Sequence, residues 1–359
     1  MRLLFSATVL SSVCLVAVNA GSIGERVRFP RAVKARTSYT LQDDYRGEAF
    51  FDEFNFFSSP DPTQGLVDYQ SRENAISKGL AFVQDDGVTV LAVDNTTPIP
   101  SGSNRASVRI ESKKQYREGL FIADFEAMPF GCSTWPAWWS YSITDYPNGG
   151  EIDVIEGVNS QPYNDMTFWH AGRTCTFPPD ALSGGTGDIV DADSDCVDPT
   201  SEQMSCSFQD ENPASFGEGF NAAGGGVYAH LVDAEGISIW HFTRSNIPND
   251  ITNQNPDPST WGAPVAQWKS TSCDIAQHVH GHILTINTSL CGSWAGDDDV
   301  WAGSGCPGTC AETVADPGNF DNARWKINYV SAAPTSPLML SPHGSEDTLT
   351  ATPHRSTVI

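Results

Sequence analysis

The sequence predicts an all-β protein, a sandwich of antiparallel sheets. From residue 39 to residue 330, short apolar and aromatic segments alternate with clusters of Gly, Pro, Asn and Asp, and long helical periodicity is scarce. This spacing is typical of many antiparallel strands joined by turns. We expect a single domain over residues 39–330, because all-β domains often exceed ordinary domain length. The clearest strand candidates are ASVRIES, GLFIADFEAM, EIDVIEGV, GVYAHLV, GISIWHF, HILTINTSL and WKINYV.

The segment ahead of this domain is interpreted as a leader. Residues 1–20 combine Arg2, an apolar run and the small residue Ala20, which is the pattern of a secretory signal peptide rather than of a buried first helix. Residues 21–38 are rich in Arg and Lys in a chain that is otherwise acidic, and we interpret them as a basic lead or propeptide, with a solvated basic face as the alternative. No segment is apolar for long enough to be a convincing membrane span.

Two polar segments are predicted to lack regular structure. Residues 176–226 are rich in Asp, Ser, Gly and Pro, and we expect a long loop region tied by disulfides. Residues 331–359 are rich in Ser, Thr and Pro and lack an apolar end. We expect them to form a disordered tail that is a candidate for O-glycosylation and carries no lipid anchor.

The cysteines, sequons and charge point to a secreted protein, extracellular or associated with a cell wall. Eight cysteines remain after the leader, and an even number in such a chain predicts disulfides without choosing the pairing; a zinc site is the less favoured alternative. Asn-x-Thr/Ser sequons predict N-glycosylation at Asn95 and Asn287. The formal net charge of −24 would be repelled by phosphate backbones, so we expect no nucleic acid partner. A monomer is the default expectation.

One strand candidate, NGGEIDVIEGVN over residues 148–159, carries three acids: Glu151, Asp153 and Glu156. Because side chains alternate along a strand, Glu151 and Asp153 share a face, whereas Glu156 would point the other way. An unpaired charge on the core side would be costly or would take up a proton. A β-bulge between Asp153 and Glu156 removes this conflict, since the extra residue turns all three acids to one face.

Three acids on one face predict acid–base and nucleophilic chemistry. Two carboxylates beside a glycosidic bond are able to run a double displacement, in which one attacks the anomeric carbon and the other donates and later accepts a proton. Asp153 between them keeps negative charge close, which favours a retained proton on the group that acts as acid. A calcium site or a satisfied polar strand is the alternative, but calcium loops place their oxygens around a turn, whereas this run is framed by Ile and Val.

Aromatic and polar residues near this strand are candidates for substrate binding, because sugar rings present apolar faces and glucan clefts are commonly lined by aromatic side chains. The expected substrate-binding residues are Trp135, Trp139, Trp169, His170 and Asn55. Core packing is the alternative for each Trp, and alternation allows Trp138 and Trp139 to face opposite ways. A turn cap is the alternative for Asn55.

The run EIDVIE resembles the bulged Glu-x-Asp-x-x-Glu signature of glycoside hydrolase family 16, in its laminarinase-like branch. The likeness is to fungal endo-1,3(4)-β-glucanases and covers most of the chain. The segments that carry it are FFDEFNFFSSPDPTQGLVDY, NRASVRI, CSTWPAWW, NGGEIDVIEGVN, GGGVYA, RSNIP, LCGSWAG and NARWKINYV.

The resemblance implies a β-jelly-roll sandwich of two antiparallel sheets with a substrate cleft on the concave sheet. It also implies that Glu151 is the nucleophile, that Glu156 is the acid/base, and that Asp153 assists by hydrogen bonding and charge. The implied activity is that of a retaining endo-β-glucanase acting on internal β-1,3 linkages, with mixed β-1,3-1,4-glucan as a further substrate and with no cofactor or metal. A glucan transglycosylase and a β-glucan-binding protein without hydrolysis are the alternatives.

Two segments depart from the fungal pattern. His230-Leu231-Val232 replaces a Glu-Trp pair after GGGVYA, and FWHAGRTC replaces the more usual LHTSDGC. Both bear on subsites and neither touches the acids. His278, His280 and His282 imitate a zinc triad, but two of them, His278 and His282, lie where the resembling sequences also carry His, so we expect structural hydrogen bonds.

Overall fold

The structure, a computed structural model, describes residues 39–171, 175–190 and 203–334. The predicted signal peptide and basic lead lie outside the described residues, as does the predicted tail from residue 335 onward. Internal contacts divide the chain after residue 36, and every element described below belongs to the unit that follows.

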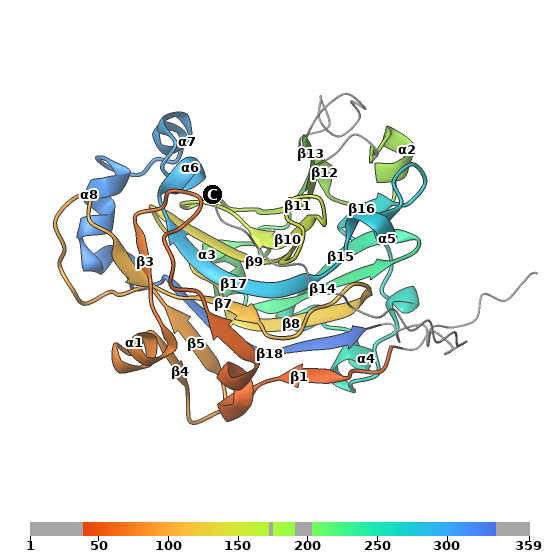
Figure 1. The fold of residues 1–359 in the computed structure, drawn as a ribbon, viewed down its shortest axis with the longest axis horizontal. Helices are drawn as coiled ribbons and strands as arrows, with labels where there is room; N and C mark the ends of the chain where they lie inside the picture. Colours follow the sequence, from red (N-terminus) through yellow and green to blue (C-terminus); the bar gives the residue numbers. More distant parts are fainter. Residues whose placement is uncertain (1–38, 172–174, 191–202, 335–359) are drawn as a thin grey trace, which may run out of the picture. The chain divides into compact units, whose positions relative to one another are not determined.

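Two eight-stranded antiparallel sheets form a sandwich (Figure 1). The first, here called the cleft sheet, has the spatial order β12 (Asp188–Ile189), β13 (Gln203–Asp210), β11 (Asn164–Ala171), β10 (Glu151–Glu156), β9 (Thr134–Ser142), β17 (His282–Leu290), β7 (Arg109–Ser112) and β2 (Phe54–Phe56). The second, the outer sheet, has the order β16 (Ala266–Lys269), β15 (Gly236–Thr243), β14 (Gly226–Asp233), β8 (Gly119–Ala127), β18 (Arg324–Pro334), β5 (Thr89–Ala92) and β4 (Ala81–Val83), with β1 (Asp43–Tyr45) also paired to β18. The predicted fold class is confirmed.

The remaining described elements are short. A parallel pair joins β3 (Val67–Tyr69) and β6 (Arg105–Ser107). The α-helices are α1 (Arg72–Ser77), α2 (Pro179–Leu182), α3 (Gly217–Ala222), α4 (Asn249–Thr252), α5 (Ile275–His278), α6 (Gly292–Ala295), α7 (Asp298–Gly303) and α8 (Cys310–Ala315). The 3₁₀ helices are Gly47–Glu53, Arg244–Asn246, Pro258–Thr260 and Pro317–Phe320. Over the ranges that the structure covers, no helix combines the length and apolar character needed to span a bilayer.

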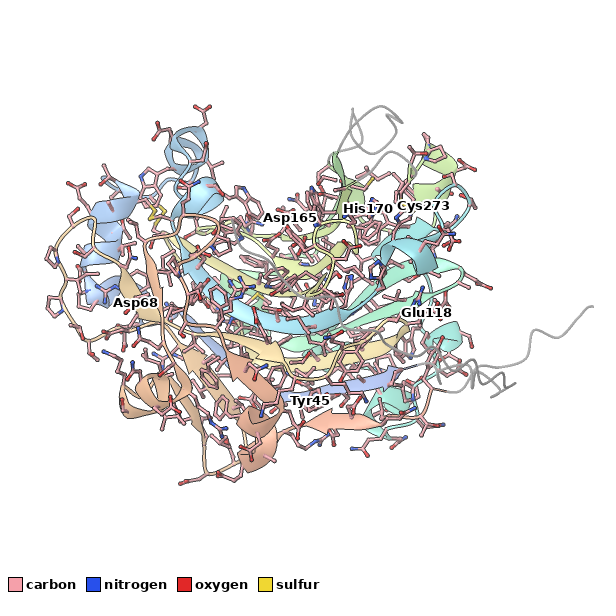
Figure 2. The ribbon with its side chains drawn as sticks, in the orientation of Figure 1. Tyr45, Asp68, Glu118, Asp165, His170 and Cys273 are labelled. Atoms are coloured by element: carbon pink, nitrogen blue, oxygen red, sulfur yellow. A yellow bond between two sulfur atoms is a disulfide. The ribbon has the colours of Figure 1, made fainter. Side chains whose placement is uncertain are left out.

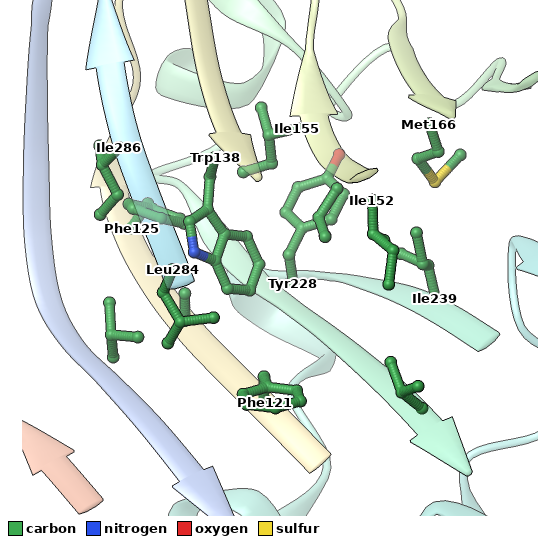
Figure 3. Packing of buried hydrophobic residues seen from close by; sticks show 14 of the residues in the cluster. Phe121, Phe125, Trp138, Ile152, Ile155, Met166, Tyr228, Ile239, Leu284 and Ile286 are labelled. Carbon is green, nitrogen blue, oxygen red and sulfur yellow. The ribbon is translucent and has the colours of Figure 1, made fainter. Parts of the chain in front are cut away.

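The core lies between the two sheets and is filled by alternate residues of their strands. Trp138 of β9 and Ile152 of β10 meet Phe125 of β8 and Tyr228 of β14 (Figure 3). His230 of β14 is also buried here, stacked on Phe121 and edge-on to Trp138. The departure at His230 therefore concerns the core and not a subsite, which corrects the sequence-based expectation.

The predicted loop over residues 176–226 is wrong in part, and residues 191–202 of it lie outside the described residues. Within it, β13 pairs with β11 along its full length. Cys206 and Phe208 are buried, whereas Ser205 and Gln209 on the opposite face are half-buried, so the exposed face of this strand is polar and resembles a loop in composition. The sandwich also extends past residue 330, because β18 continues to Pro334 through pairing with β8.

Disulfides tie the loops at the ends of the cleft sheet. The pairs are Cys132–Cys306, Cys175–Cys273 and Cys291–Cys310, and Cys206 is also disulfide-bonded. The predicted use of the cysteines is confirmed. Such cross-links typically contribute about 2–4 kcal/mol each by restricting the unfolded chain.

Candidate active site

The strand β10 contains a bulge directly after Asp153. Toward β11, Asp153 lies opposite Thr167 and Glu156 lies opposite Asp165, so two residues of β10 face the single residue Met166. The register toward β9 shifts after Asp153 as well. The bulge that the acid spacing predicts is confirmed.

The bulge separates acids from apolar residues. Val154 and Ile155 are both fully buried in the core, although they are adjacent in the chain. Glu151, Asp153 and Glu156 all line the hollow on the other face of the cleft sheet. The extra residue of the bulge lets the three acids face the cleft while Val154 and Ile155 face the core.

A buried side chain that the sequence analysis missed holds the bulge open. Asn164, which is fully buried, accepts a hydrogen bond from the Glu156 backbone N–H (3.0 Å) and donates one to the Val154 carbonyl (2.9 Å). Backbone groups at a bulge lose their ladder partners, and buried ones need another partner. A single Asn outside the acid run carries no spacing signal, so only the register reveals it.

The acids lie where two hollows meet on the cleft sheet. The aromatic lobe, about 550 Å³, is lined by Phe57, Arg109, Trp139, Tyr141, Asn287 and Ser289. The polar lobe, about 430 Å³, is lined by Asp165, Thr167, Trp169, Ser205, Ser207 and Trp294. The three acids, Thr63, Trp135 and Tyr146 line both lobes, so the two form one continuous cleft.

Aromatic rings flank the acids at the Glu151 end. Trp139 stacks on Tyr141 with ring centroids 4.9 Å apart, and Tyr146 stacks on Trp169 at 5.4 Å. Tyr141 and Tyr146 meet edge to face at 5.8 Å, which joins the two stacks into one row. Such a row offers apolar surface to sugar rings.

A second aromatic pair flanks the Glu156 end. Trp135 and Trp294 meet edge to face at 5.5 Å, and the Trp135 indole N–H donates to a Glu156 carboxyl oxygen (2.8 Å). Trp135, like Trp139 and Trp169, thus lies in the cleft. Trp294 comes from α6, far along the chain, and the sequence analysis missed it.

Asn55 lies at the edge of the same sheet. It is exposed on β2, opposite Glu111 of β7, and it lines neither lobe. Substrate binding by Asn55 stays a prediction, and it concerns sugars that extend beyond the aromatic lobe.

His170 does not face the cleft, and its predicted contact with substrate is wrong. Neighbouring residues of β11 alternate, so Trp169 faces the cleft and His170 faces the core with 2% of its surface exposed. Figure 2 labels His170 near one end of β11 and Asp165 near the other. The His170 ring bonds His278 (2.7 Å), and burial lowers the pKa of His170 to about 4.

The histidines His278, His280 and His282, which imitate a zinc triad in the sequence, do not lie on one face of a strand. His278 ends α5 and His282 begins β17. His282 bonds the Ser140 hydroxyl (2.9 Å) and the Gly149 carbonyl (2.7 Å), just before β10. The predicted structural hydrogen bonding is confirmed for these two.

Asn287 is buried inside the cleft, and the glycan predicted there does not fit the folded protein. Its side-chain oxygen accepts from the Trp139 indole (2.7 Å), and its amide nitrogen donates to the Tyr69 hydroxyl (3.2 Å). Only 7% of Asn287 is exposed. Asn95, by contrast, lies half-buried in a loop with its amide on the exposed Asp321.

We therefore expect protein from a eukaryotic secretory host to carry an N-glycan at Asn95 and none at Asn287. Peptide mass mapping after enzymatic deglycosylation in heavy-oxygen water measures both sites at once. Thr97→Ala, which destroys the first sequon, should lower the mass by a glycan, and Ser289→Ala should not. An occupied Asn287 in folded, secreted protein would contradict this placement.

Burial raises the pKa of all three acids, and neighbouring groups oppose or reinforce the rise differently at each one. The pKa of Glu151 rises to about 7 through burial, and a hydrogen bond from Tyr146 and the charge of Arg109 oppose the rise. The pKa of Glu156 rises to about 8 through burial, opposed by the Trp135 hydrogen bond and reinforced by the neighbouring acids. Burial and both glutamates raise the pKa of Asp153. Tyr146 and Arg109 thus favour the ionised form of Glu151, whereas the neighbouring acids favour the protonated form of Glu156.

Arg109 is a further cleft residue that the sequence analysis did not single out, although it lies in the quoted segment NRASVRI. It is 5% exposed, pairs with Glu111 (2.8 Å), and lies over the rings of Phe57 (4.4 Å) and Trp139 (5.0 Å). A buried cation near Glu151 favours the ionised form of that acid.

The raised pKa of Glu156 predicts a pH-dependent stability. The ordinary value is 4.5, so between about pH 4.5 and pH 8 the folded state holds a proton that the unfolded chain releases, and stability falls as pH rises through this window. Glu156→Gln should therefore raise the melting temperature at pH 8 by about 2 °C or more, and by much less at pH 4. Thermal unfolding at both pH values tests this, with the exposed Glu218→Gln as control. An equal change at both pH values would contradict it.

The family model described as XgeA-like, catalytic GH16 domain, matches residues 54–332. An endo-1,3(4)-β-glucanase of Arthroderma benhamiae is 39% identical over 313 residues, which cover 84% of this chain and 67% of that protein.

Two solved structures are similar over the same region. GH16 laminarinase 16A from Phanerochaete chrysosporium, with β-glucans (6-O-glucosyl-laminaritriose) in both donor and acceptor sites, is 38% identical with a TM-score of 0.77 and covers 82% of this chain and 99% of its own. An elongating GH family 16 β-1,3-glucosyltransferase is also 38% identical, with a TM-score of 0.72 and the same coverage.

Proposed function

The chain belongs to glycoside hydrolase family 16, and from this premise we propose that it is a secreted endo-β-glucanase. It hydrolyses internal β-1,3 linkages, with mixed β-1,3-1,4-glucan as a further substrate, through a retaining double displacement. The observation that carries the proposal is the bulged strand, whose acids Glu151, Asp153 and Glu156 line one cleft between an aromatic row and an aromatic pair.

In the first step Glu156 is the acid and Glu151 is the nucleophile. The Glu156 proton passes to the glycosidic oxygen while a Glu151 oxygen bonds the anomeric carbon, and the leaving sugar departs with a free hydroxyl. The acids beside Glu156 favour its protonated form, which suits the donor, and the charge of Arg109 and the Tyr146 hydroxyl favour an ionised Glu151. The Trp135 N–H fixes one Glu156 oxygen.

In the second step the two glutamates exchange direction: Glu156 acts as the base and Glu151 is the leaving group. The ionised Glu156 removes a proton from water, the water oxygen bonds the anomeric carbon, and Glu151 leaves as a carboxylate. Two inversions give net retention. Asp153, between the two, shares a proton with them, because burial and both glutamates raise the pKa of its carboxyl.

The continuous cleft supports attack on internal linkages. Both lobes open onto the acids, so a glucan chain has room on either side of the bond that is cut. The aromatic rows give apolar contact to sugar faces, and the polar lobe offers carboxylate and hydroxyl groups to sugar hydroxyls.

Transglycosylation is a second candidate, favoured by the likeness to the elongating β-1,3-glucosyltransferase. The same carboxylates would act, and the difference is whether water or a sugar hydroxyl reacts with the glycosyl enzyme. Extracellular location is supported by the predicted signal peptide and the three described disulfides.

The proposal is tested by incubating the protein with laminarin, mixed-linkage glucan and cellulose, and by separating the products by size. We expect laminarin to shorten rapidly into oligosaccharides of several lengths, as internal cleavage requires. Products longer than the starting oligosaccharides would identify transfer instead. Binding to laminarin without release of reducing ends would overturn the hydrolase and leave a binding protein.

A further inference from the structure

One acid of the polar lobe, Asp165, has no role in the two proposed steps. Asp165 of β11 lies in the cleft, directly opposite Glu156 of β10. We propose that Asp165 is a positioning residue for the Glu156 proton: its fixed carboxylate keeps the acid/base protonated in the first step and basic in the second. The proposal rests on the proposed function.

The strand register places the two acids side by side. Residues directly opposite each other in an antiparallel pair have Cβ atoms about 4.5–5.5 Å apart and point to the same face. Glu156 and Asp165 both line the polar lobe, which agrees with this geometry. Like charges in such a pair repel, so ionising both carboxyls is unfavourable and one of them retains a proton.

Hydrogen bonds decide which acid carries the charge. The two Asp165 carboxyl oxygens each accept from an amide, one from Gln209 (2.8 Å) and the other from Gln161 (3.1 Å). The Gln161 amide is itself oriented, because its oxygen accepts from the Val158 backbone N–H (3.0 Å). Donors to a carboxylate favour its ionised form, so the charge stays on Asp165 and the proton on Glu156.

The other groups that face Glu156 do not replace this contribution. Asp153 and Glu151 lie on its own strand, the neutral Trp135 indole comes from β9, and Arg109 and Asp61 line the aromatic lobe. Burial is the largest cause of the raised Glu156 pKa, followed among the acids by Glu151 and Asp165.

Asp165 differs from Glu151 in one chemical respect. When Glu151 bonds the anomeric carbon it becomes an ester and loses its charge. Asp165 is not consumed, so its charge acts on Glu156 in both steps. An anion beside Glu156 makes it a stronger base for the water that releases the product.

The first test compares the pH dependence of kcat/KM on laminarin for the wild type and Asp165→Asn. We expect the alkaline limb of the Asp165→Asn profile to lie about one pH unit lower, a roughly tenfold loss of activity at high pH, with activity near the acid limb changed little. Asp298→Asn, an exposed acid on α7, is the matched control and should leave the profile unchanged. An unmoved alkaline limb in folded Asp165→Asn would overturn the proposal.

The second test does not depend on turnover. A ¹³C NMR titration of the Glu156 carboxyl carbon, assigned with Glu156→Gln, should show a lower midpoint in Asp165→Asn than in the wild type. If the protein releases no sugar from any glucan, the proposed function fails. The titration still decides whether the charge of Asp165 keeps the proton on Glu156. Gln209→Met, which removes one donor from Asp165, should shift the midpoint in the same direction by less, and serves if Asp165→Asn does not fold.

Discussion

Glu151→Gln and Glu156→Gln are each expected to lower kcat on laminarin by about 10³-fold or more while the protein stays folded. Glutamine keeps the shape of the side chain but neither attacks the anomeric carbon nor donates the proton. Folding should be preserved, because both carboxyls have a raised pKa and are costly to ionise in the cleft. Reducing-end release beside thermal unfolding measures both effects.

An aryl β-glucan oligosaccharide with a good leaving group separates the two roles. Such a leaving group needs no proton, so Glu156→Gln should still form the glycosyl enzyme in a rapid burst, whereas Glu151→Gln should form none. Exposed Glu218→Gln is the control for loss of one charge and should retain wild-type rates. Full activity in either cleft variant would contradict the assignment of that carboxyl.

Asn164→Ala is expected to damage both stability and catalysis, although Asn164 touches no substrate. The substitution leaves the Glu156 backbone N–H and the Val154 carbonyl without their buried partner. Unsatisfied buried groups cost about 1–3 kcal/mol each, so we expect the two together to lower the free energy of unfolding by about 2–6 kcal/mol. A relaxed bulge also misplaces Glu156, and a shift of about 1 Å can lower the rate about 10²-fold.

Urea unfolding and laminarin kinetics on the same preparation test this. The surface variant Asn246→Ala should change the free energy of unfolding by no more than about 0.5 kcal/mol and leave the rate unchanged. A stable, fully active Asn164→Ala protein would show that the bulge holds its shape without this side chain.

The sandwich and the acid face were predictable because each depends on local periodicity. Turn residues between short apolar runs indicate strands, and the misfit of Glu156 to a period of two indicates a bulge. The strand β13 was missed because its outward residues are polar, so composition alone suggests a loop.

The errors at His170 and Asn287 have a common cause. A motif names a residue without saying which face it occupies. Alternation could have shown that Trp169 and His170 cannot both face the cleft. It could not have placed Asn287, because every residue of β17 is buried, one face by the core and the other by cleft side chains such as Trp139. The contacts of Asn164 and Trp294 could not be predicted from the sequence, because their partners lie on other elements of the fold.

In the proposed mechanism, Glu151 and Glu156 act in two successive inversions at one anomeric carbon. The most direct test follows the hydrolysis of a laminari-oligosaccharide by ¹H NMR from the first minutes, before the product anomers equilibrate. The structure predicts that the new reducing end appears first as the β-anomer and then converts slowly to the α/β mixture. First appearance of the α-anomer would mean a single inversion and would contradict the double displacement.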